Sequence, residues 1–331
     1  MKALRLAGPT LTEADVEGRV LTHDLGRGLR KGTLLGARHV PALRAVAEVH
    51  VVELEPGDVH EDEAAARLGR MLAGAGVEVG PPVQSQVRLL STRRGLTRVK
   101  REAVERLNAL PNVGVFTVVD GQAVDAGEEV AGAKVTPVAV GEDLLEQAAA
   151  VAKELAPAVE VVAFRPLRTL VVATERLKPA ARRMFAEAVT RKLGWYGAEV
   201  LGVRQIARSG EAVRRAYEEA RSISAELLLL AGASSIDPLD PAHLELANVG
   251  GELVRRGAPA HPGSMLWLGR LEDTVVFGVA SCAGFGKNTS LDLVLPFVFA
   301  YGRADAADFV RLGYGGLIEA GAGRRFPPYG S

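Results

Sequence analysis

From about residue 168 onward, short apolar runs alternate with stretches in which apolar residues recur every three or four positions. The apolar runs have the length of buried strands, and the stretches between them are typical of helices with one buried face. Near-continuous apolar strands separated by amphipathic helices indicate an open α/β fold with a doubly wound, mostly parallel sheet. The expected strands are 169–173, 199–204, 227–231 and 275–279, and the expected helices are 180–193, 210–222 and 241–249.

The first 155 residues follow a less regular pattern, with short β-like runs around a glycine-rich turn at 26–32. The expected strands are 19–22, 49–54, 113–119 and 130–140, and the expected helices are 40–46, 61–75, 100–109 and 148–155. Ala156 precedes a proline, which pushes it away from helical geometry, so the last of these helices ends there. We therefore expect a small β-rich module at 1–60, an α+β module at 61–155 and the α/β domain at 160–331.

Composition removes several classes of function. The 331 residues carry 40 basic and 40 acidic side chains, so the strong field of a nucleic-acid binder or of an anionic-membrane binder is missing. The single cysteine, Cys282, allows no disulfide within one chain and no thiolate metal cluster, which fits a reducing compartment. Neither a signal peptide nor a membrane-spanning apolar run is visible. We expect a cytoplasmic protein with no nucleic-acid partner and no membrane partner.

Open parallel sheets bind ligands beyond the carboxyl ends of their strands, which directs attention to the loops after residues 173, 230 and 279. The second of these loops has the strongest signal. Gly232 and Ala233 let the backbone approach a ligand, and Ser234 and Ser235 offer hydroxyl and N–H donors that suit phosphate oxygens. Asp237 is placed to hold Mg²⁺ or to accept a hydrogen bond from a ring N–H.

The same loop also has a purely structural interpretation. Asp240 stands directly before Pro241, and an aspartate before a proline at the first helical position is a common helix cap. Ser234 and Ser235 can likewise shape a turn without touching a ligand. Both interpretations stay open at this point: Asp240 either binds a ligand or caps the helix, and the serines either bind phosphate or close a turn.

The loop after residue 279 brings glycines, hydroxyls and one lysine together. Ser281 offers a hydroxyl, and Lys287 is either a phosphate or molybdate contact or a solvated side chain. Cys282 is either a reactive thiol or a small buried filler. The segment is not a P-loop, because Asn288 follows Lys287 where that motif requires serine or threonine.

Residues 232–237, with the sequence Gly-Ala-Ser-Ser-Ile-Asp, resemble the Gly-Gly-Thr/Ala/Val-Ser/Gly-x-x-Asp signature of the molybdopterin-binding domain. That domain is shared by molybdenum insertases, molybdopterin adenylyltransferases and gephyrin. Further segments resemble the family in the same order along the chain: the strand and turn at 170–175, the Gly-Gly at 248–253, the Pro-Gly turn and strand at 260–270, and the last strand at 275–279. The resemblance covers about residues 168–296 and implies the fold of that domain.

The resemblance also implies a ligand and its site. It implies molybdopterin or adenylylated molybdopterin as the cofactor, Mg²⁺ and molybdate as further ligands of an insertase, and Asp237 as the catalytic and metal-binding residue. The residues implied to bind the cofactor are Thr174, Glu175, Gly232, Ala233, Ser234, Ser235, Asp240, His261, Pro262, Gly263, Ser264, Ser281 and Lys287. One departure bears on the chemistry: where insertases place lysines around the Pro-Gly turn, this chain has His261 and Ser264.

Two functions follow from the resemblance, and the residues do not decide between them. The first is an enzyme, a molybdopterin molybdotransferase that inserts molybdenum. The second is a carrier or maturation factor that binds the cofactor without changing it, and the loss of both lysines favours it. A third interpretation keeps the fold and loses the ligand. By analogy we expect a homo-oligomer, with a molybdoenzyme or another cofactor-biosynthesis protein as partner.

Overall fold

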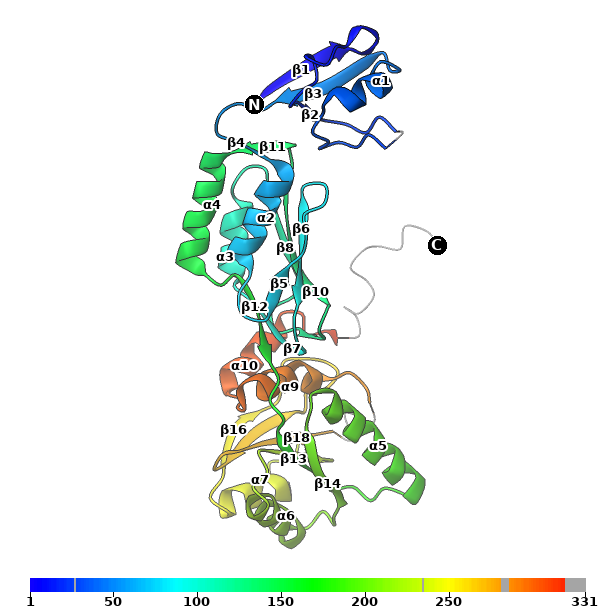
Figure 1. The fold of residues 1–331 in the computed structure, drawn as a ribbon. Coiled ribbons are helices and arrows are strands. Elements are labelled where there is room, and N and C mark those ends of the chain that lie inside the picture. Colours follow the sequence, from blue (N-terminus) through cyan, green and yellow to red (C-terminus); the bar gives the residue numbers. More distant parts are fainter. Residues whose placement is uncertain (27, 234, 281–285, 319–331) are drawn as a thin grey trace. The chain divides into compact units, whose positions relative to one another are not determined.

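The structure is a computed structural model that describes residues 1–26, 28–233, 235–280 and 286–318. The chain divides into two compact units, Met1–Val162 and Ala163–Ser331, and both contain helices and strands (Figure 1). The finer boundary expected at residue 60 stays a prediction. Across the described ranges, no helix combines the length and the apolar character that a membrane crossing needs.

The N-terminal unit begins with a small antiparallel sheet of order β1-β3-β2. Its elements are β1 (Lys2–Ala7), η1 (Gly8–Thr10), β2 (Val20–Leu21), η2 (Ala37–His39), α1 (Val40–Leu43) and β3 (Glu48–Glu53). Leu21, Leu43 and Val51 lie in its apolar core. The strands expected at 19–22 and 49–54 and the helix near 40–46 are confirmed. The sequence pattern did not reveal β1, because its side chains are exposed or half-buried and leave no apolar run.

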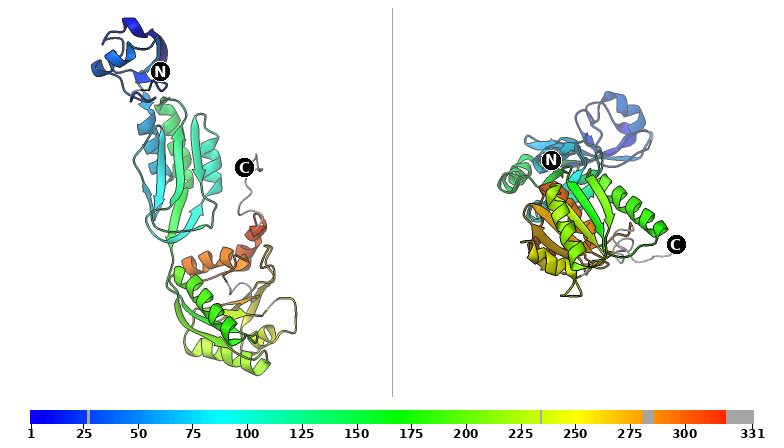
Figure 2. Two further views of the ribbon diagram at one scale, coloured as in Figure 1. Left: turned by 90° about the vertical axis from the view of Figure 1, so that its right-hand side faces the viewer. Right: turned by 90° about the horizontal axis from the view of Figure 1, so that it is seen from below.

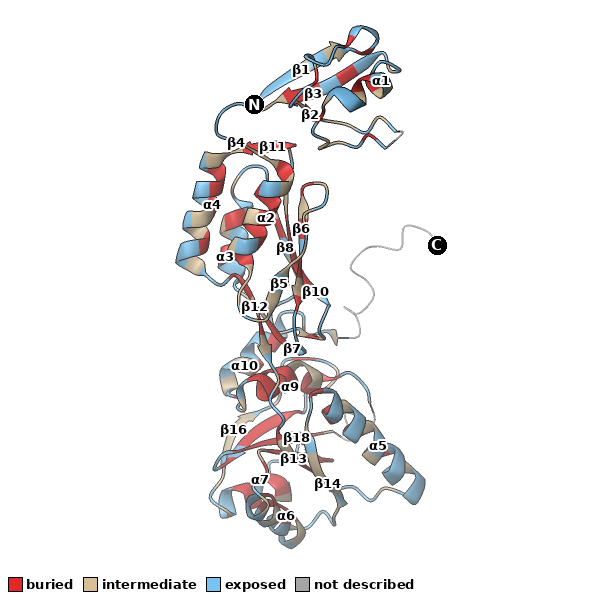
Figure 3. Ribbon diagram, in the orientation of Figure 1, coloured by how far each residue is buried: buried red, intermediate tan, exposed pale blue. Residues whose placement is uncertain are grey.

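The rest of this unit packs helices against an antiparallel sheet of order β5-β6-β10-β8. The helices are α2 (Glu61–Leu72), α3 (Arg101–Asn108) and α4 (Glu142–Leu155), and the strands are β5 (Val77–Val79), β6 (Gln86–Ser91), β8 (Val113–Thr117) and β10 (Glu129–Val135). Shorter ladders contain β4 (Asp58–His60), β11 (Ala139–Gly141), β7 (Gly95–Val99), β9 (Ala123–Val124) and β12 (Val159–Ala163). The buried residues of these helices and strands, red in Figure 3, form one apolar core.

Three expectations for this unit need correction. The helix expected at 148–155 begins at Glu142, where two acidic residues in the first turn interact favourably with the helix dipole. The strand expected at 130–140 is divided into β10 and β11, because Pro137 between them has no N–H to give to a ladder. The helix expected at 61–75 ends earlier, at Leu72.

Gly32 lies against the start of α2. His60 Nε2 is 2.9 Å from the carbonyl oxygen of Gly32. Gly32 has a φ of +79°, and a side chain there would overlap the carboxylate of Glu61. Glu61 is buried, one of its oxygens has no hydrogen-bond partner among the described residues, and burial raises the pKa of its carboxyl group. The backbone conformation and the buried carboxylate therefore both require glycine at position 32.

The C-terminal unit is built on a six-stranded sheet of order β14-β13-β15-β18-β17-β16. Its strands are β13 (Arg168–Ala173), β14 (Glu199–Gln205), β15 (Leu227–Ala231), β16 (Glu252–Arg256), β17 (Trp267–Leu271) and β18 (Thr274–Val279). The ladders among β14, β13, β15 and β18 are parallel, and those to β17 and β16 are antiparallel. The four strands expected from the sequence are confirmed and form the parallel part of the sheet.

Helices cover both faces of this sheet (Figures 1 and 2). They are α5 (Pro179–Trp195), α6 (Gly210–Ser222), α7 (Pro241–Asn248), α9 (Ser290–Tyr301) and α10 (Ala306–Val310), followed by the turn η3 (Arg311–Gly313). Tyr217 of α6 is fully buried, and its hydroxyl donates to the carbonyl oxygen of Ala242 in α7 at 2.6 Å. Leu170, Leu228 and Trp267 pack beneath these two helices in the same core. The helices expected at 180–193, 210–222 and 241–249 are confirmed.

The order of the strands creates a switch point between β13 and β15. From β13 the chain passes through α5 to β14 on one side, and from β14 it passes through α6 to β15 on the other side of β13. The connections therefore leave β13 and β15 in opposite directions, and the loops beyond their carboxyl ends are free to diverge around a ligand.

The strand β14 is the edge of the sheet next to β13. Arg204 reaches back over Gly202 of the same strand, so that a side chain on Gly202 would overlap the guanidinium group. Arg204 Nε lies 3.1 Å from Glu219 Oε1 of α6, which holds the guanidinium in this place.

Candidate functional site

The loops after β13 and β15 are joined by Thr174. Its N–H and its hydroxyl both donate to the carbonyl oxygen of Ala231, at 2.8 and 3.2 Å. Gly232 follows Ala231 with a φ of +88°, and a Cβ atom there would lie 2.6 Å from Glu175 Cγ and 2.9 Å from Thr174 Oγ1. Only glycine fits this place without strain, and Thr174, Glu175 and Gly232 meet at the switch point as the sequence predicts.

The loop after β15 is held to its neighbours by backbone hydrogen bonds. Gly232 N–H donates to the carbonyl oxygen of Val279 at 2.8 Å, and Ser235 N–H donates to the carbonyl oxygen of Met265 at 3.2 Å. The carbonyl oxygen of Ala233 accepts from Trp267 Nε1 at 3.0 Å. Ser235 was expected to offer both a hydroxyl and an N–H to a ligand, but the N–H is already used within the protein. Ser234 lies outside the described residues.

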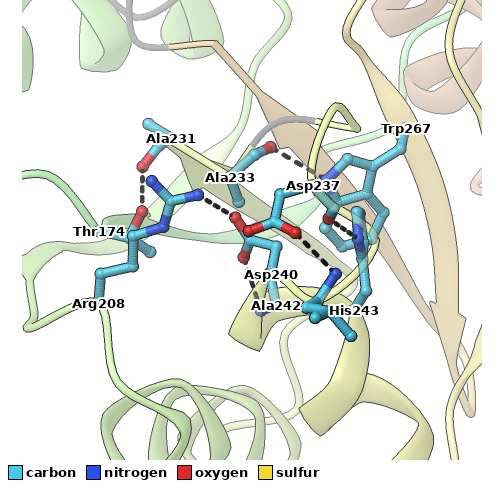
Figure 4. A network of polar contacts seen from close by, with 10 residues as sticks. Thr174, Arg208, Ala231, Ala233, Asp237, Asp240, Ala242, His243 and Trp267 are labelled. Atoms are coloured by element: carbon cyan, nitrogen blue, oxygen red, sulfur yellow. Dashed lines mark hydrogen bonds and ion pairs between the residues drawn. The ribbon is translucent and has the colours of Figure 1, made fainter.

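Asp237 is exposed at the outer end of this loop. Its Oδ1 accepts from the N–H of Leu239 at 2.9 Å, and its backbone carbonyl accepts from the N–H of Asp240 at 3.1 Å (Figure 4). The Asp237 side chain therefore stabilises a turn through Oδ1, and its other carboxylate oxygen, Oδ2, is open to solvent or to a ligand. The described residues contain no group of three or more histidine, cysteine or carboxylate side chains placed to hold a metal ion. Mg²⁺ would fit here only with oxygens of the ligand completing its shell.

Asp240 is a buried helix cap. It is 2% exposed, and its Oδ1 accepts from the N–H of Ala242 at 2.8 Å. Its Oδ2 forms an ion pair with Arg208, which follows β14 (Figure 4). The structural interpretation of Asp240 is thereby confirmed, and a direct role in binding a ligand stays a prediction.

His243 supports the same loop from α7. It is 5% exposed, its Nδ1 lies 3.2 Å from the carbonyl oxygen of Asp237, and its ring meets Trp267 edge-on at a centroid distance of 4.9 Å. Its Nε2 is buried and has no partner among the residues that the structure describes. Burial, followed by the positive charge of Arg256, lowers the pKa of His243, so the ring is neutral at pH 7.

The turn that contains Pro262 and Gly263 lies at the start of α9. The carbonyl oxygen of Pro262 accepts from the N–H of Ser290 at 2.9 Å, and that of Gly263 accepts from the hydroxyl of Ser290 at 2.5 Å. His261 and Ser264, on either side, are exposed. Met265 next to the turn accepts from Ser235, so the turn and the loop after β15 are neighbours. The predicted residues 261–264 therefore belong to the same carboxyl-end region as Gly232.

Of the loop after β18, Lys287 is described, and Ser281 and Cys282 lie outside the described residues. The carbonyl oxygen of Lys287 accepts from Lys192 Nζ at 3.0 Å, and Lys192 Nζ lies 2.7 Å from Asp292 of α9. The ammonium group of Lys287 is exposed. A hollow of about 690 Å³ beside these residues, with Trp195 on its wall, contains none of the predicted site residues. Contact of Lys287 with a ligand stays a prediction.

A larger cleft of about 1070 Å³ opens beyond the carboxyl ends of β13 and β14. Its lining includes the predicted residues Thr174 and Glu175, and it adds residues that sequence reasoning missed: Arg176, Lys178, Arg182, Gln205 and Arg208. The loop after β13 is one of the three loops to which the sequence directs attention, so its basic residues could have been identified as candidate site residues. The loop after β14 could not be identified in this way, because the position of β14 beside β13 depends on the order of strands in the folded sheet.

No protein-family model and no curated protein matches the chain. The solved structures that it resembles include molybdopterin biosynthesis proteins. One is the MoeA protein of Pyrococcus horikosii, at 14% identity and a TM-score of 0.32, covering 76% of each chain. Another is MoaB of Thermus thermophilus, at 16% identity and a TM-score of 0.28, covering 40% of this chain and 91% of that chain. A third is the Mog protein of Mycobacterium ulcerans, at 17% identity and a TM-score of 0.29, covering 40% of this chain and 95% of that chain. At these TM-scores the likenesses assign no ligand and no residue role to this chain.

Proposed function

We propose that the C-terminal unit binds molybdopterin, free or adenylylated, as a carrier or maturation factor in molybdenum cofactor biosynthesis. The observation that carries this proposal is the switch point between β13 and β15, where Thr174 joins the two loops and Gly232 turns the chain with a left-handed φ. Sheets of this topology bind ligands at that place. Residues 232–237, which resemble the signature of the molybdopterin-binding domain, follow β15 in the same loop and suggest the class of ligand.

The described side chains offer complementary groups to such a ligand. Asp237 has an exposed carboxylate that can accept from ring N–H groups or share Mg²⁺ with a phosphate. The hydroxyl of Ser235 and the ammonium of Lys287 suit phosphate oxygens. Binding would order these side chains around the ligand, while Thr174 and the Asp240 cap keep the backbone of both loops fixed.

A carrier accounts better than an insertase for His261 and Ser264. Insertion must strip water from molybdate and hold its charge beside a phosphate, which requires fixed cations. A hydrogen bond to a charged group contributes about 1.5 to 3 kcal/mol, and each 1.36 kcal/mol is about tenfold in rate. Unless another cation such as Lys287, Arg255, Arg270 or one of the basic residues beyond β13 and β14 takes their place, replacing two lysines by a neutral serine and a histidine would therefore slow insertion by several orders of magnitude. We propose accordingly that the cofactor is passed on to a molybdoenzyme or another biosynthesis protein in the cytoplasm, by a homo-oligomer of this chain.

Calorimetric titration of the protein with molybdopterin tests the binding. Asp237→Asn should weaken it about tenfold, which corresponds to about 1.4 kcal/mol, with an unchanged melting temperature. Asp273→Asn, an equally exposed carboxylate after β17, is the matched control and should leave the affinity unchanged. Equal affinity of wild type and Asp237→Asn would remove Asp237 from the site, and no binding at all would refute the proposal.

A turnover assay separates the carrier from the insertase. The protein is mixed with adenylylated molybdopterin, Mg²⁺ and micromolar molybdate, and AMP release is followed together with reconstitution of a cofactor-free molybdoenzyme. A carrier binds without turnover, and His261→Lys should raise any residual rate. Fast AMP release that depends on molybdate would establish the insertase instead.

A further inference from the structure

The cleft beyond β13 and β14 is strongly basic. It is lined by Arg176, Lys178, Arg182 and Arg208, against a single acidic side chain, Glu175. Arg176 and Lys178 come from the loop after β13, Arg182 from the first turn of α5, and Arg208 from the loop after β14. Residues separate in the sequence thus bring like charges to one hollow. Like charges repel, so an anion bound in the cleft would relieve the repulsion among these side chains.

Arg176, Lys178 and Arg182 also lack carboxylate partners within the described part of the chain. Many other arginines of this protein have such partners: Arg214 Nε lies 2.8 Å from Glu245, and Arg215 Nη2 lies 2.7 Å from Glu211. What distinguishes this place is that several such cations gather around one cleft of about 1070 Å³.

Arg208 differs from the other cations because it is held in position. It forms an ion pair with Asp240, which is 2% exposed and is itself fixed by its hydrogen bond to the N–H of Ala242. The guanidinium group reaches Asp240 from the loop after β14 (Figure 4). Because one side of its planar fork is bonded to Asp240, the remaining N–H groups keep a defined direction. Such a group binds an anion with little loss of side-chain entropy.

We propose that this cleft binds a phosphate group, with Arg176, Lys178 and Arg182 supplying charge and with Asp240 acting as a positioning residue for Arg208. Phosphate esters and polyphosphates carry the charge and the acceptor oxygens that such a set of donors matches. The phosphate belongs either to the pterin ligand or to a separate nucleotide or polyphosphate. The proposal does not depend on molybdopterin binding, because a phosphate compound alone suffices to test it.

If Asp240 positions Arg208, removing the negative charge of Asp240 should weaken the binding of an anion, which is the opposite of what charge alone predicts. Asparagine caps helices about as well as aspartate, so Asp240→Asn keeps the cap and removes the negative charge. If Asp240 acted only through its charge, removing it beside a basic cleft would tighten the binding of an anion. If Asp240 positions Arg208, the freed guanidinium loses its direction and the anion binds more weakly. The two mechanisms therefore predict opposite changes.

The experiment is calorimetric titration of the full chain with inorganic pyrophosphate, at low and at physiological ionic strength. We expect Arg182→Gln and Arg208→Gln each to weaken binding about fivefold or more, and Asp240→Asn to weaken it about threefold or more. Arg183→Gln, one position along α5 and outside the cleft, is the matched control for Arg182→Gln. Asp305→Asn, at the cap of α10, is the matched control for Asp240→Asn. Both controls should change the affinity less than about twofold.

Three results would overturn the proposal: no binding of pyrophosphate by the wild type, equal weakening by Arg183→Gln and Arg182→Gln, or tighter binding by Asp240→Asn. A loss of affinity in Asp240→Asn supports the proposal only if this variant keeps the melting temperature of the wild type. Arg208→Lys is the second variant, because lysine keeps the positive charge and lacks the planar fork of arginine. It should also bind pyrophosphate more weakly than the wild type. Competition then identifies the source of the phosphate. Pyrophosphate that displaces molybdopterin assigns the cleft to the pterin's own phosphate. Simultaneous binding of pyrophosphate and molybdopterin assigns the cleft to a separate phosphate compound. If the protein binds pyrophosphate and does not bind molybdopterin, the proposed function is refuted and the phosphate site in the cleft is retained.

Discussion

Replacing Gly232 by alanine tests whether the switch point depends on the close approach of its two loops. A left-handed φ costs a residue with a side chain about 1 to 2 kcal/mol, offset in part by the smaller entropy of the unfolded alanine chain. The new Cβ would also lie 2.9 Å from Thr174 Oγ1 and 2.6 Å from Glu175 Cγ. Glu175 is exposed and can move aside, but Thr174 is buried and would lose its hydrogen bond to Ala231, worth about 1 kcal/mol.

Together these effects amount to about 2 kcal/mol, and a unit of this size should lose about 4 to 8 °C in melting temperature. The chain has two tryptophans, Trp195 and Trp267, and both lie in the C-terminal unit, so intrinsic fluorescence follows the unfolding of that unit alone. Gly250→Ala is the matched control, because Gly250 has a φ of +83° and no atom near its Cβ position. It should lose only about half as much. If Gly232→Ala is no more destabilising than Gly250→Ala, the argument from loop contact is wrong.

Further predictions concern single buried groups. Tyr217→Phe removes the hydrogen bond between α6 and α7 and should lower the free energy of unfolding of the C-terminal unit by about 1 kcal/mol, measured by urea denaturation; an unchanged midpoint would contradict it. Because the pKa of His243 is lowered when folded, the unfolded chain takes up a proton near pH 6.5 and the folded chain does not, so this unit should lose stability as the pH falls below about 6.5. His243→Gln should flatten that dependence, and melting curves at pH 7.5 and 5.5 compare the two. The pKa of Glu61 is raised, so its carboxylate destabilises the N-terminal unit as the pH rises above about 4.5. Glu61→Gln should therefore slow hydrogen exchange in α2 at pH 7, and faster exchange would show that the carboxylate is satisfied.

The parallel part of the C-terminal sheet could be predicted because its strands are buried on both faces. The expected strand at 227–231 coincides with β15, whose side chains are all buried. The helix α9 had no comparable signal. It is apolar on nearly every side and contains Pro296, which removes an internal hydrogen bond and is usually taken as the end of a helix. Its capping box at Thr289 and Asp292 is the local feature that could have revealed its start.

The candidate site shows the same division between local and long-range information. The Asp240 cap follows from residues adjacent in the sequence, and the structure confirms it. The basic cleft does not, because Arg182 and Arg208 are ordinary charged residues in separate segments until the sheet places β14 beside β13. The use of the Ser235 N–H by Met265 was equally hidden, since it depends on where β17 begins. Chemistry carried by one loop was accessible from the sequence, and chemistry assembled from several loops was not.

The position of Arg204 has a consequence for the behaviour of the protein in concentrated solution. An edge strand of seven residues offers unpaired N–H and C=O groups that a strand from another molecule can join. Here the guanidinium of Arg204 lies over Gly202 in the middle of β14 and is tied to Glu219. An incoming strand would bring its own side chains beside this charged pair, and charged side chains on an edge strand disfavour such pairing. We therefore expect Arg204 to oppose growth of the sheet beyond β14 when molecules crowd together.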